Sequence, residues 1–138
     1  MEKMMVKLDE GAYLPMRAHA LDAGYDLRTP VDVHLFPDRS ATVNTGVHVA
    51  IPEGYVGMLK TKSGLNMKSI VGEGVIDSGY TGPIKVKLYN HGIVERDFKA
   101  GDKIIQLVII PIITPDLEEV EYLPETERGD NGFGSTGA

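Results

Sequence analysis

Short runs in which apolar and polar residues alternate at a period of two constrain the fold of this chain most. Such alternation is typical of a strand with one face in a core and the other in solvent. The clearest runs cover residues 31–36, 43–50 and 84–89, and turn-forming Gly, Pro, Asn and Asp residues separate them. Many short strands joined by regular turns predict an all-β domain, either a sandwich, a jelly roll or a small barrel.

Two segments depart from this pattern. Residues 103–113 are almost continuously apolar, which predicts a strand that is buried on both faces or packed against another subunit. Residues 64–70 alone look helical, for two turns at most. Because the sequence has no internal repeat or linker, we predict one β domain at residues 1–127 and a flexible glycine-rich arm at residues 128–138.

Composition limits the classes of partner. Fourteen basic residues face twenty acidic ones, a net charge of −6, which disfavours binding to nucleic acid. Binding of a small polyanion is still possible if basic residues gather at one site or if a metal ion supplies the positive charge. The chain has no cysteine, and we expect no disulfide framework and a cytoplasmic location. The N-terminus lacks the apolar core of a signal peptide, and the apolar run at residues 107–113 is too short to span a bilayer, so we expect no membrane partner.

The four histidines are scattered and lack the spacing of metal ligands, so we assign them no metal: His19, His34, His48 and His91.

The C-terminal arm combines groups that suit a nucleotide. Its four glycines let the backbone approach a ligand, and successive amides with the Ser135 and Thr136 hydroxyls can form a nest for phosphate. Arg128 adds a planar cation and Phe133 a flat face for a base. We interpret residues 128–138 as an arm that folds over a nucleotide polyphosphate. The alternative is a frayed terminus with no function.

Asp77 and Tyr80 lie in a glycine-flanked segment, residues 74–82, that predicts a tight hairpin. An aspartate at such a bend can accept a proton from water. An isolated aspartate in a turn is more often an Asx cap of the backbone, and both interpretations stay open.

Two further segments could contact a ligand, and a third holds an isolated acid that alone indicates little. Lys62, Ser63 and Gly64 stand where the short helix is predicted to begin, which favours either a phosphate site or a simple serine N-cap. Gln106 lies within an apolar strand, where a buried amide needs partners from the backbone or from a ligand. Asp26 is an isolated acid near a glycine turn.

Five segments, in this order and at these spacings, resemble the five motifs of the homotrimeric dUTPases. They are AGYDL at 23–27, the run PEGYVG to KSGL at 52–65, GVIDSGYTG at 74–82, GDKIIQLV at 101–108 and RGDNGFGSTG at 128–137. The resemblance implies a jelly-roll fold of the β-clip type. It also implies cleavage of dUTP to dUMP and pyrophosphate with Mg2+ on the triphosphate, which limits uracil in DNA and supplies dUMP for dTMP synthesis.

The resemblance assigns roles residue by residue. Asp77 matches the acid that activates the attacking water, and Tyr80 matches the ring that leaves no room for a ribose 2′-hydroxyl. The backbone that reads uracil corresponds to Gly74, Val75, Ile76 and the strand near Lys85. The residues that bind the phosphates in the family correspond to Lys62, Ser63, Gly64 and Gln106. Asp26 matches an acid that binds the metal through water.

The closing arm corresponds to Arg128 at the γ-phosphate, Phe133 over the base, and Gly134, Ser135 and Thr136. In the family each site draws on three subunits, which implies a homotrimer.

The chain departs from the family pattern at two positions. Lys62 stands where an arginine is usual, so bidentate phosphate binding is lost, and Gly79 stands where an acid is common. Two alternatives remain: a dCTP deaminase, which needs a glutamate near the pyrimidine and could use Glu73, and a nucleotide sensor without catalysis.

Overall fold

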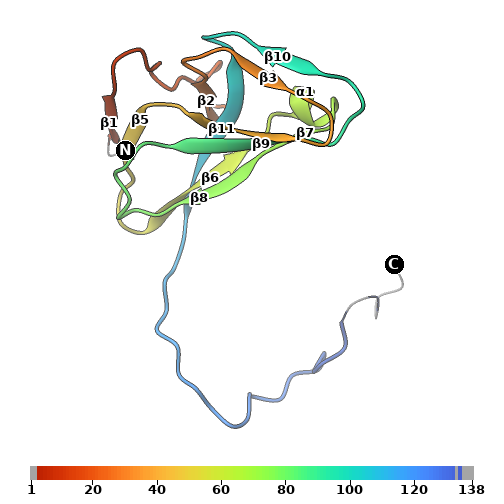
Figure 1. Ribbon diagram of the computed structural model, residues 1–138. Helices are drawn as coiled ribbons and strands as arrows, with labels where there is room; N and C mark the ends of the chain where they lie inside the picture. Colours follow the sequence, from red (N-terminus) through yellow and green to blue (C-terminus); the bar gives the residue numbers. More distant parts are fainter. Residues whose placement is uncertain (1–2, 133, 135–138) are drawn as a thin grey trace.

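The structure is a computed structural model and describes residues 3–132 and residue 134. Over these residues the chain forms strands and one short helix (Figure 1). In chain order they are β1 (Met5–Leu8), β2 (Gly24–Arg28), β3 (Val33–Leu35), β4 (Ser40–Asn44), β5 (Val47–Ala50), β6 (Tyr55–Lys60), α1 (Ser63–Asn66), β7 (Ile70–Val71), β8 (Glu73–Ile76), β9 (Lys85–Asn90), β10 (Arg96–Phe98) and β11 (Lys103–Pro111).

The strands make four antiparallel sheets that share one core. The largest has the order β2-β11-β6-β8, a second has the order β4-β9-β7, and β1-β5 and β10-β3 are two-stranded. Every sheet contributes apolar side chains to the core or packs against it, and the fully buried ones include Leu27, Leu59, Leu88, Ile105 and Leu107. Burying each such side chain stabilises the fold by about 1.5–3 kcal/mol. The all-β jelly-roll prediction is confirmed.

Strand β9 shows the predicted alternation most clearly. Val86 and Leu88 are buried, whereas Lys85 and Lys87 are exposed on the opposite face. The run at residues 43–50 was expected as one alternating stretch and instead forms β4 and β5, which belong to different sheets. The chain turns at Gly46, where φ is +68°, a conformation that glycine adopts without steric cost. The alternation persists across this break because both strands face the same core.

The apolar run after residue 103 is confirmed as a strand for most of its length. Strand β11 lies between β2 and β6, and Ile104, Ile105 and Leu107 are fully buried. Its far end emerges from the body, since Ile110 is 40% exposed. The helix is shorter than expected, a single turn that ends before Ser69, whose φ is +63°.

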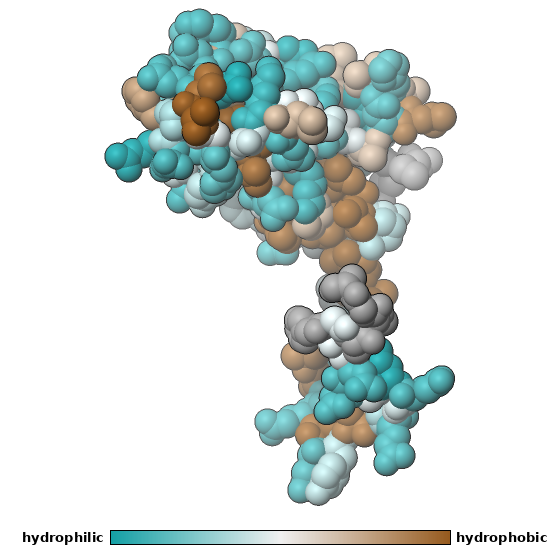
Figure 2. Space-filling view, turned by 90° about the vertical axis from the view of Figure 1, so that its right-hand side faces the viewer, coloured by the Kyte–Doolittle hydropathy of each residue, from teal (hydrophilic) through white to brown (hydrophobic). Residues whose placement is uncertain are grey.

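The described residues after Pro111 form no helix or strand and leave the body as an extended segment (Figure 1). Several of its apolar side chains are strongly exposed, among them Ile113, Leu117 and Leu123. Figure 2 shows apolar surface at the lower end of the body, where this segment begins. Among the described residues, no helix combines the length and the hydropathy needed to cross a membrane.

Candidate functional site

A small cavity lies where two sheets meet. It is open to solvent, has a volume of about 220 Å³ and is lined by Val75, Ile76, Asp77, Tyr80, Pro83 and Lys85. The prediction of a hairpin in this region is wrong, because β8 pairs with β6 and β9 pairs with β4 and β7. Residues 77–84 are instead a loop that crosses from one sheet to the other, which we call the crossing loop. The cavity is therefore framed by the end of one sheet and the start of another.

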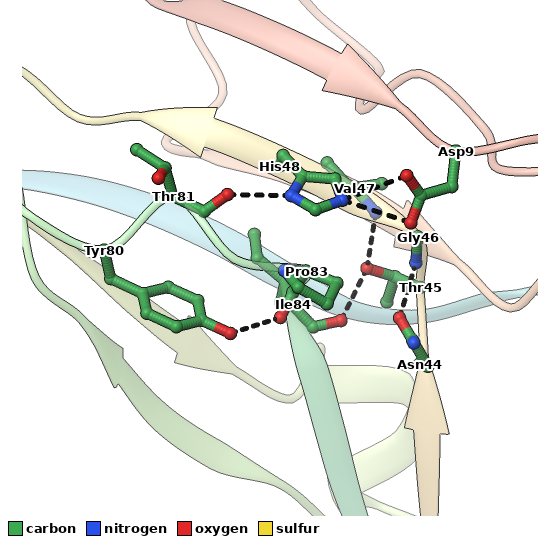
Figure 3. A network of polar contacts seen from close by, with 10 residues as sticks. All are labelled: Asp9, Asn44, Thr45, Gly46, Val47, His48, Tyr80, Thr81, Pro83 and Ile84. Atoms are coloured by element: carbon green, nitrogen blue, oxygen red, sulfur yellow. Dashed lines mark hydrogen bonds and ion pairs between the residues drawn. The ribbon is translucent and has the colours of Figure 1, made fainter.

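Main-chain bonds shape the crossing loop and leave its carboxylate exposed. The Tyr80 amide donates to the main-chain carbonyl of Asp77 at 3.0 Å. The Tyr80 hydroxyl donates to the Pro83 carbonyl at 2.8 Å (Figure 3). The carbonyl of Asp77, not its side chain, closes this turn, so the Asx-cap interpretation is not supported. The Asp77 carboxylate and the Tyr80 ring both line the cavity.

Strand β8 presents main-chain groups at the same cavity. It is the last strand of its sheet and pairs with β6 alone, through Gly74 opposite Leu59 and Val75 opposite Met58. The other edge of such a strand carries unpaired N–H and C=O groups. These groups can read the hydrogen-bonding edge of a flat ligand without any side chain.

A second group of predicted residues centres on Asp26. Its side chain is 4% exposed, and its two oxygens lie 2.6 Å from Lys62 Nζ and 3.3 Å from Lys103 Nζ. A buried carboxylate is stable only when it is paired in this way. Two ammonium groups around one carboxylate leave a local excess of positive charge, although the chain as a whole is acidic.

Gln106 belongs to this second group through the register of the sheet. It lies opposite Asp26 in β2 and opposite Lys60 in β6, and Lys60 in turn lies opposite Glu73 in β8. Directly opposed residues share one face of a sheet. Asp26, Gln106, Lys60 and Glu73 therefore form a polar row across all four strands, closed at one end by a Lys60–Glu73 ion pair of 2.9 Å.

The helix start lies next to this polar row. Lys62 is the N-cap residue of α1, and no side chain caps the helix, so the interpretation of Ser63 as an N-cap is wrong. Ser63 and Gly64 are both exposed. Their position beside Lys62 leaves the Ser63 hydroxyl accessible to a ligand.

Within one chain, the cavity and the polar row lie apart from each other. In the β6–β8 pair, Lys60 lies opposite Glu73 and Gly57 lies opposite Ile76. The polar row and the cavity are thus separated by three residues of strand, about 10 Å, with Lys62 and Asp77 extending beyond opposite ends.

The described residues of the arm, 128–132 and 134, contact neither group within this chain. Arg128 is exposed, and its Nε donates to the Asn131 carbonyl at 2.6 Å, on a segment that lies apart from the body (Figure 1). Gly134 is exposed with φ of +99°. The predicted residues Phe133, Ser135 and Thr136 lie outside the described residues.

Sequence reasoning missed three contributors: Lys103, Pro83 and His48. Lys103 completes the pairing of Asp26, and its place in the GDKIIQLV segment was the available signal. Pro83 lines the cavity and accepts the Tyr80 hydrogen bond. His48 contacts the crossing loop at Thr81, from a strand distant in sequence, and no local pattern indicates this.

Within residues 3–132 and 134, no cluster of three or more His, Asp or Glu side chains could hold a metal ion. Asp26 is a single carboxylate. Mg2+ commonly binds one or two carboxylates and completes its shell with water and substrate phosphates.

Comparisons with known proteins agree along the whole chain. A family model described as dUTPase matches residues 10–137. The chain is 48% identical over 133 residues to a deoxyuridine 5′-triphosphate nucleotidohydrolase of Arabidopsis thaliana, covering 95% of this chain and 80% of that protein. It is 46% identical over 134 residues to the mouse protein of the same name, covering 96% of this chain and 83% of that one.

Solved structures are similar as well. The dUTPase of Staphylococcus bacteriophage 80alpha with dUPNHPP superposes with a TM-score of 0.93 at 36% identity, covering 100% of both chains. A mutant dUTPase from phage phi11 of S. aureus, in which the coordination of a structural Mg(II) ion was determined, superposes with a TM-score of 0.82 at 35% identity. That match covers 88% of this chain and 98% of the other.

Proposed function

The chain belongs to the dUTPase family and is a dUTP diphosphatase, and we propose that it cleaves dUTP with a water molecule activated by Asp77. In this reaction the water oxygen attacks the α-phosphorus, the Asp77 carboxylate accepts a proton, and pyrophosphate leaves as dUMP forms. The observation that supports this role most directly is the cavity in which Asp77, Tyr80 and the edge of β8 meet. This activity limits uracil incorporation into DNA and supplies dUMP for dTMP synthesis.

We assign the pyrimidine and the sugar to this cavity. The unpaired edge of β8 around Gly74, Val75 and Ile76 offers donors and acceptors to uracil, and the backbone near Lys85 closes the other side. Cytosine reverses this pattern and would leave buried main-chain groups unpaired. The Tyr80 ring, held by its bond to Pro83, would lie under the deoxyribose and exclude a 2′-hydroxyl.

We assign the phosphates to the polar row and its neighbours. Lys62, Ser63, Gly64 and Gln106 would contact the phosphate oxygens, and Arg128 would reach the γ-phosphate. Asp26 would hold Mg2+ through water, and the ion would neutralise charge on the triphosphate. Phosphoryl transfer depends chiefly on such positioning and charge neutralisation, which suits a site without a covalent nucleophile. Lys62 supplies a point charge instead of the usual guanidinium fork, which weakens the grip without abolishing it.

We propose a homotrimer whose subunits build each site together. The cavity and the polar row lie at opposite ends of β6 and β8, and the described residues after Pro111 extend off the body. Neighbouring copies can bring the three parts to one nucleotide, with Phe133 over the base and residues 134–136 along the phosphates. Closure of the arm would exclude bulk water from the reacting phosphorus.

The structure also bears on the alternatives. A dCTP deaminase would need a glutamate beside the pyrimidine, but Glu73 lies at the far end of β8 from Asp77 and is paired with Lys60 at 2.9 Å. The sensor alternative predicts binding of dUTP without turnover.

The decisive experiment compares pyrophosphate release from dUTP, dCTP, dTTP and UTP with Mg2+ and with EDTA. We expect release from dUTP alone, loss of that release in EDTA, and no ammonia from dCTP. Asp77→Asn should lower kcat by about 100- to 10,000-fold, the usual contribution of a general base. Asp97→Asn, at an exposed aspartate of β10 outside the site, is the matched control and should stay close to wild type. Full turnover by the Asp77→Asn variant would refute this assignment of the base.

A further inference from the structure

His48 ties the crossing loop to a different part of the molecule. It lies in β5, and its Nδ1 is 2.7 Å from the carbonyl oxygen of Thr81 (Figure 3). Its Nε2 is 3.1 Å from both carboxylate oxygens of Asp9, in the turn that follows β1. The side chain is 18% exposed, so the ring is largely packed between these partners. Thr81 immediately follows Tyr80, the residue assigned to the sugar.

Both partners of the ring are hydrogen-bond acceptors. A carbonyl oxygen and a carboxylate cannot donate, so both ring nitrogens must carry a proton for both bonds to form. A neutral imidazole donates through one nitrogen and accepts through the other. The geometry therefore requires the imidazolium form, and its bonds are charge-assisted.

The other anchors of the crossing loop do not titrate near neutral pH. The Ile84 amide donates to the Val47 carbonyl at 2.8 Å, and the Thr45 hydroxyl donates to the Ile84 carbonyl at 2.7 Å (Figure 3). These bonds hold the end of the loop to β5 and its neighbouring turn. The middle of the loop, at Thr81, depends on His48.

The charged groups around the ring come from β1 and the turn after it. The Thr81 carbonyl and then Asp9 raise the pKa of His48 above its ordinary value, against partial burial and against Lys7. Lys7 lies directly opposite His48 in the β1–β5 pair. The titratable side chains of the loop itself are Asp77 and Tyr80, and the Tyr80 hydroxyl is bonded to Pro83.

We propose that His48 is a positioning residue of the catalytic site, whose doubly protonated ring fixes the crossing loop and so places Tyr80 and Asp77 for the nucleotide. This inference rests on the proposed function and adds a dependence on pH. When the ring loses a proton, the charged Asp9 retains the remaining donor, and Nδ1 then faces the Thr81 carbonyl as a second acceptor. The loop is released at Thr81 while its end at Ile84 stays in place.

The direction of the pH effect follows from the raised pKa. The stabilising contribution of His48 is fully present below about pH 6.5, the pKa of this side chain in the unfolded protein. It is lost as the pH rises through the higher pKa that His48 has in the folded protein. We therefore expect the KM for dUTP to rise about five- to tenfold across this range, the effect of losing one hydrogen bond of typical strength. kcat should change less, because the bound nucleotide helps to reorder the loop.

Two substitutions separate the two bonds. The amide nitrogen of His48→Asn can occupy the place of Nδ1 and donate to Thr81 at any pH, whereas that of His48→Gln can occupy the place of Nε2 and serve Asp9. We expect His48→Asn to show a low KM with no added pH dependence, and His48→Gln to show a high KM throughout. His34→Asn is the matched control, since His34, in β3, also pairs with carboxylates, that of Glu95 at 3.2 Å and that of Asp97 in the neighbouring strand β10. Its pH profile should follow wild type, which corrects for ionisation of the substrate.

A readout without substrate keeps this inference separate from the proposed function. Amide hydrogen exchange of residues 79–82, corrected for intrinsic rates, should show protection that falls with pH in wild type and stays constant in His48→Asn. Asp9→Asn should largely remove the fall in protection, because an amide at position 9 can donate to the neutral ring, whose Nδ1 then keeps its proton for Thr81. A wild-type pH profile in both His48→Asn and Asp9→Asn would overturn the role of His48. Absence of dUTP turnover in wild type would instead overturn the proposed function, whatever the exchange data show.

Discussion

At the scale of single residues, different groups of the crossing loop hold its shape and face the cavity. Main-chain groups and the Tyr80 hydroxyl hold the bend, so the Asp77 carboxylate is not needed as a cap. A carboxylate that is not engaged as a backbone cap can orient and deprotonate water. Tyr80 is bonded through both its main-chain amide and its side-chain hydroxyl, so its ring forms a rigid wall of the cavity.

Tyr80→Ala tests that wall. Removal of the ring should open space under the sugar, and the preference for dUTP over UTP in kcat/KM should fall by about tenfold or more, since the ring is proposed to act by excluding one hydroxyl group. Tyr80→Phe is the companion variant: it keeps the ring and loses only the bond to Pro83, so most of the preference should remain. An unchanged ratio of dUTP to UTP turnover in Tyr80→Ala would argue against the steric role.

The site residues that the sequence predicts share one property, which is that each lies in a short local motif. Asp77, Tyr80, Lys62 and Gln106 are all predicted in this way, and their roles stay predictions. Lys103 and His48 were not given roles, because their partners are distant in sequence and depend on strand register. Local patterns carry no record of which strand lies beside which.

At the scale of elements, the contact between β2 and β11 links packing to the site. A Cβ atom added to Gly24 would lie 2.9 Å from Gln106 Cβ and closer still to its amide oxygen. The Gln106 side chain therefore lies over the bare backbone of Gly24, which explains how a polar residue is accommodated in an apolar strand. This close approach fixes the amide within the polar row.

Gly24→Ala should disturb both stability and binding. Overpacking here should lower the free energy of unfolding by about 1–3 kcal/mol, and displacement of Gln106 should raise the KM for dUTP. Urea denaturation and steady-state kinetics measure the two effects. Gly79→Ala is the control, since an added Cβ there meets nothing within 4 Å. Adding Gln106→Ala to Gly24→Ala should restore part of the lost stability; a strictly additive loss would show that the two side chains do not compete for space.

Element positions were predicted well where one rule dominates. Alternation gave β9, and the apolar run gave β11. The division of residues 43–50 and the placement of β8 and β9 in different sheets were not predicted. Across residues 43–50 the chain changes sheet while its apolar side chains keep facing the same core, so the period of two is unbroken and the sequence pattern does not show the change. Between β8 and β9, the turn-forming residues of 77–84 are compatible either with a hairpin or with a loop that crosses between sheets.

At the scale of the whole molecule, the buried core lies apart from the described residues after Pro111. The buried apolar residues lie between Leu27 and Leu107, whereas the described residues after Pro111 form no regular element. The boundary between a β domain and an arm at residues 127 and 128 stays a prediction, and so does the trimer.

Truncation after Glu127 tests this division. Loss of residues 128–138 should change the free energy of unfolding by less than about 0.5 kcal/mol, as for surface changes away from the core. It should lower kcat for dUTP by about 100-fold or more, because a cation and several amides leave the phosphates. Sedimentation should still give a trimer. A truncated protein with an unchanged rate would refute the role of the arm, and a fully active monomer would refute the shared site.

The distance between the cavity and the polar row within one chain has a genetic consequence. If every pocket borrows parts from its neighbours, two defective alleles can rescue each other, one lacking the carboxylate of the crossing loop and the other lacking the arm. Co-expressed, they would produce some hybrid assemblies in which an intact loop meets an intact arm. A defective subunit would then lower the activity of every assembly that it joins, in addition to removing its own contribution.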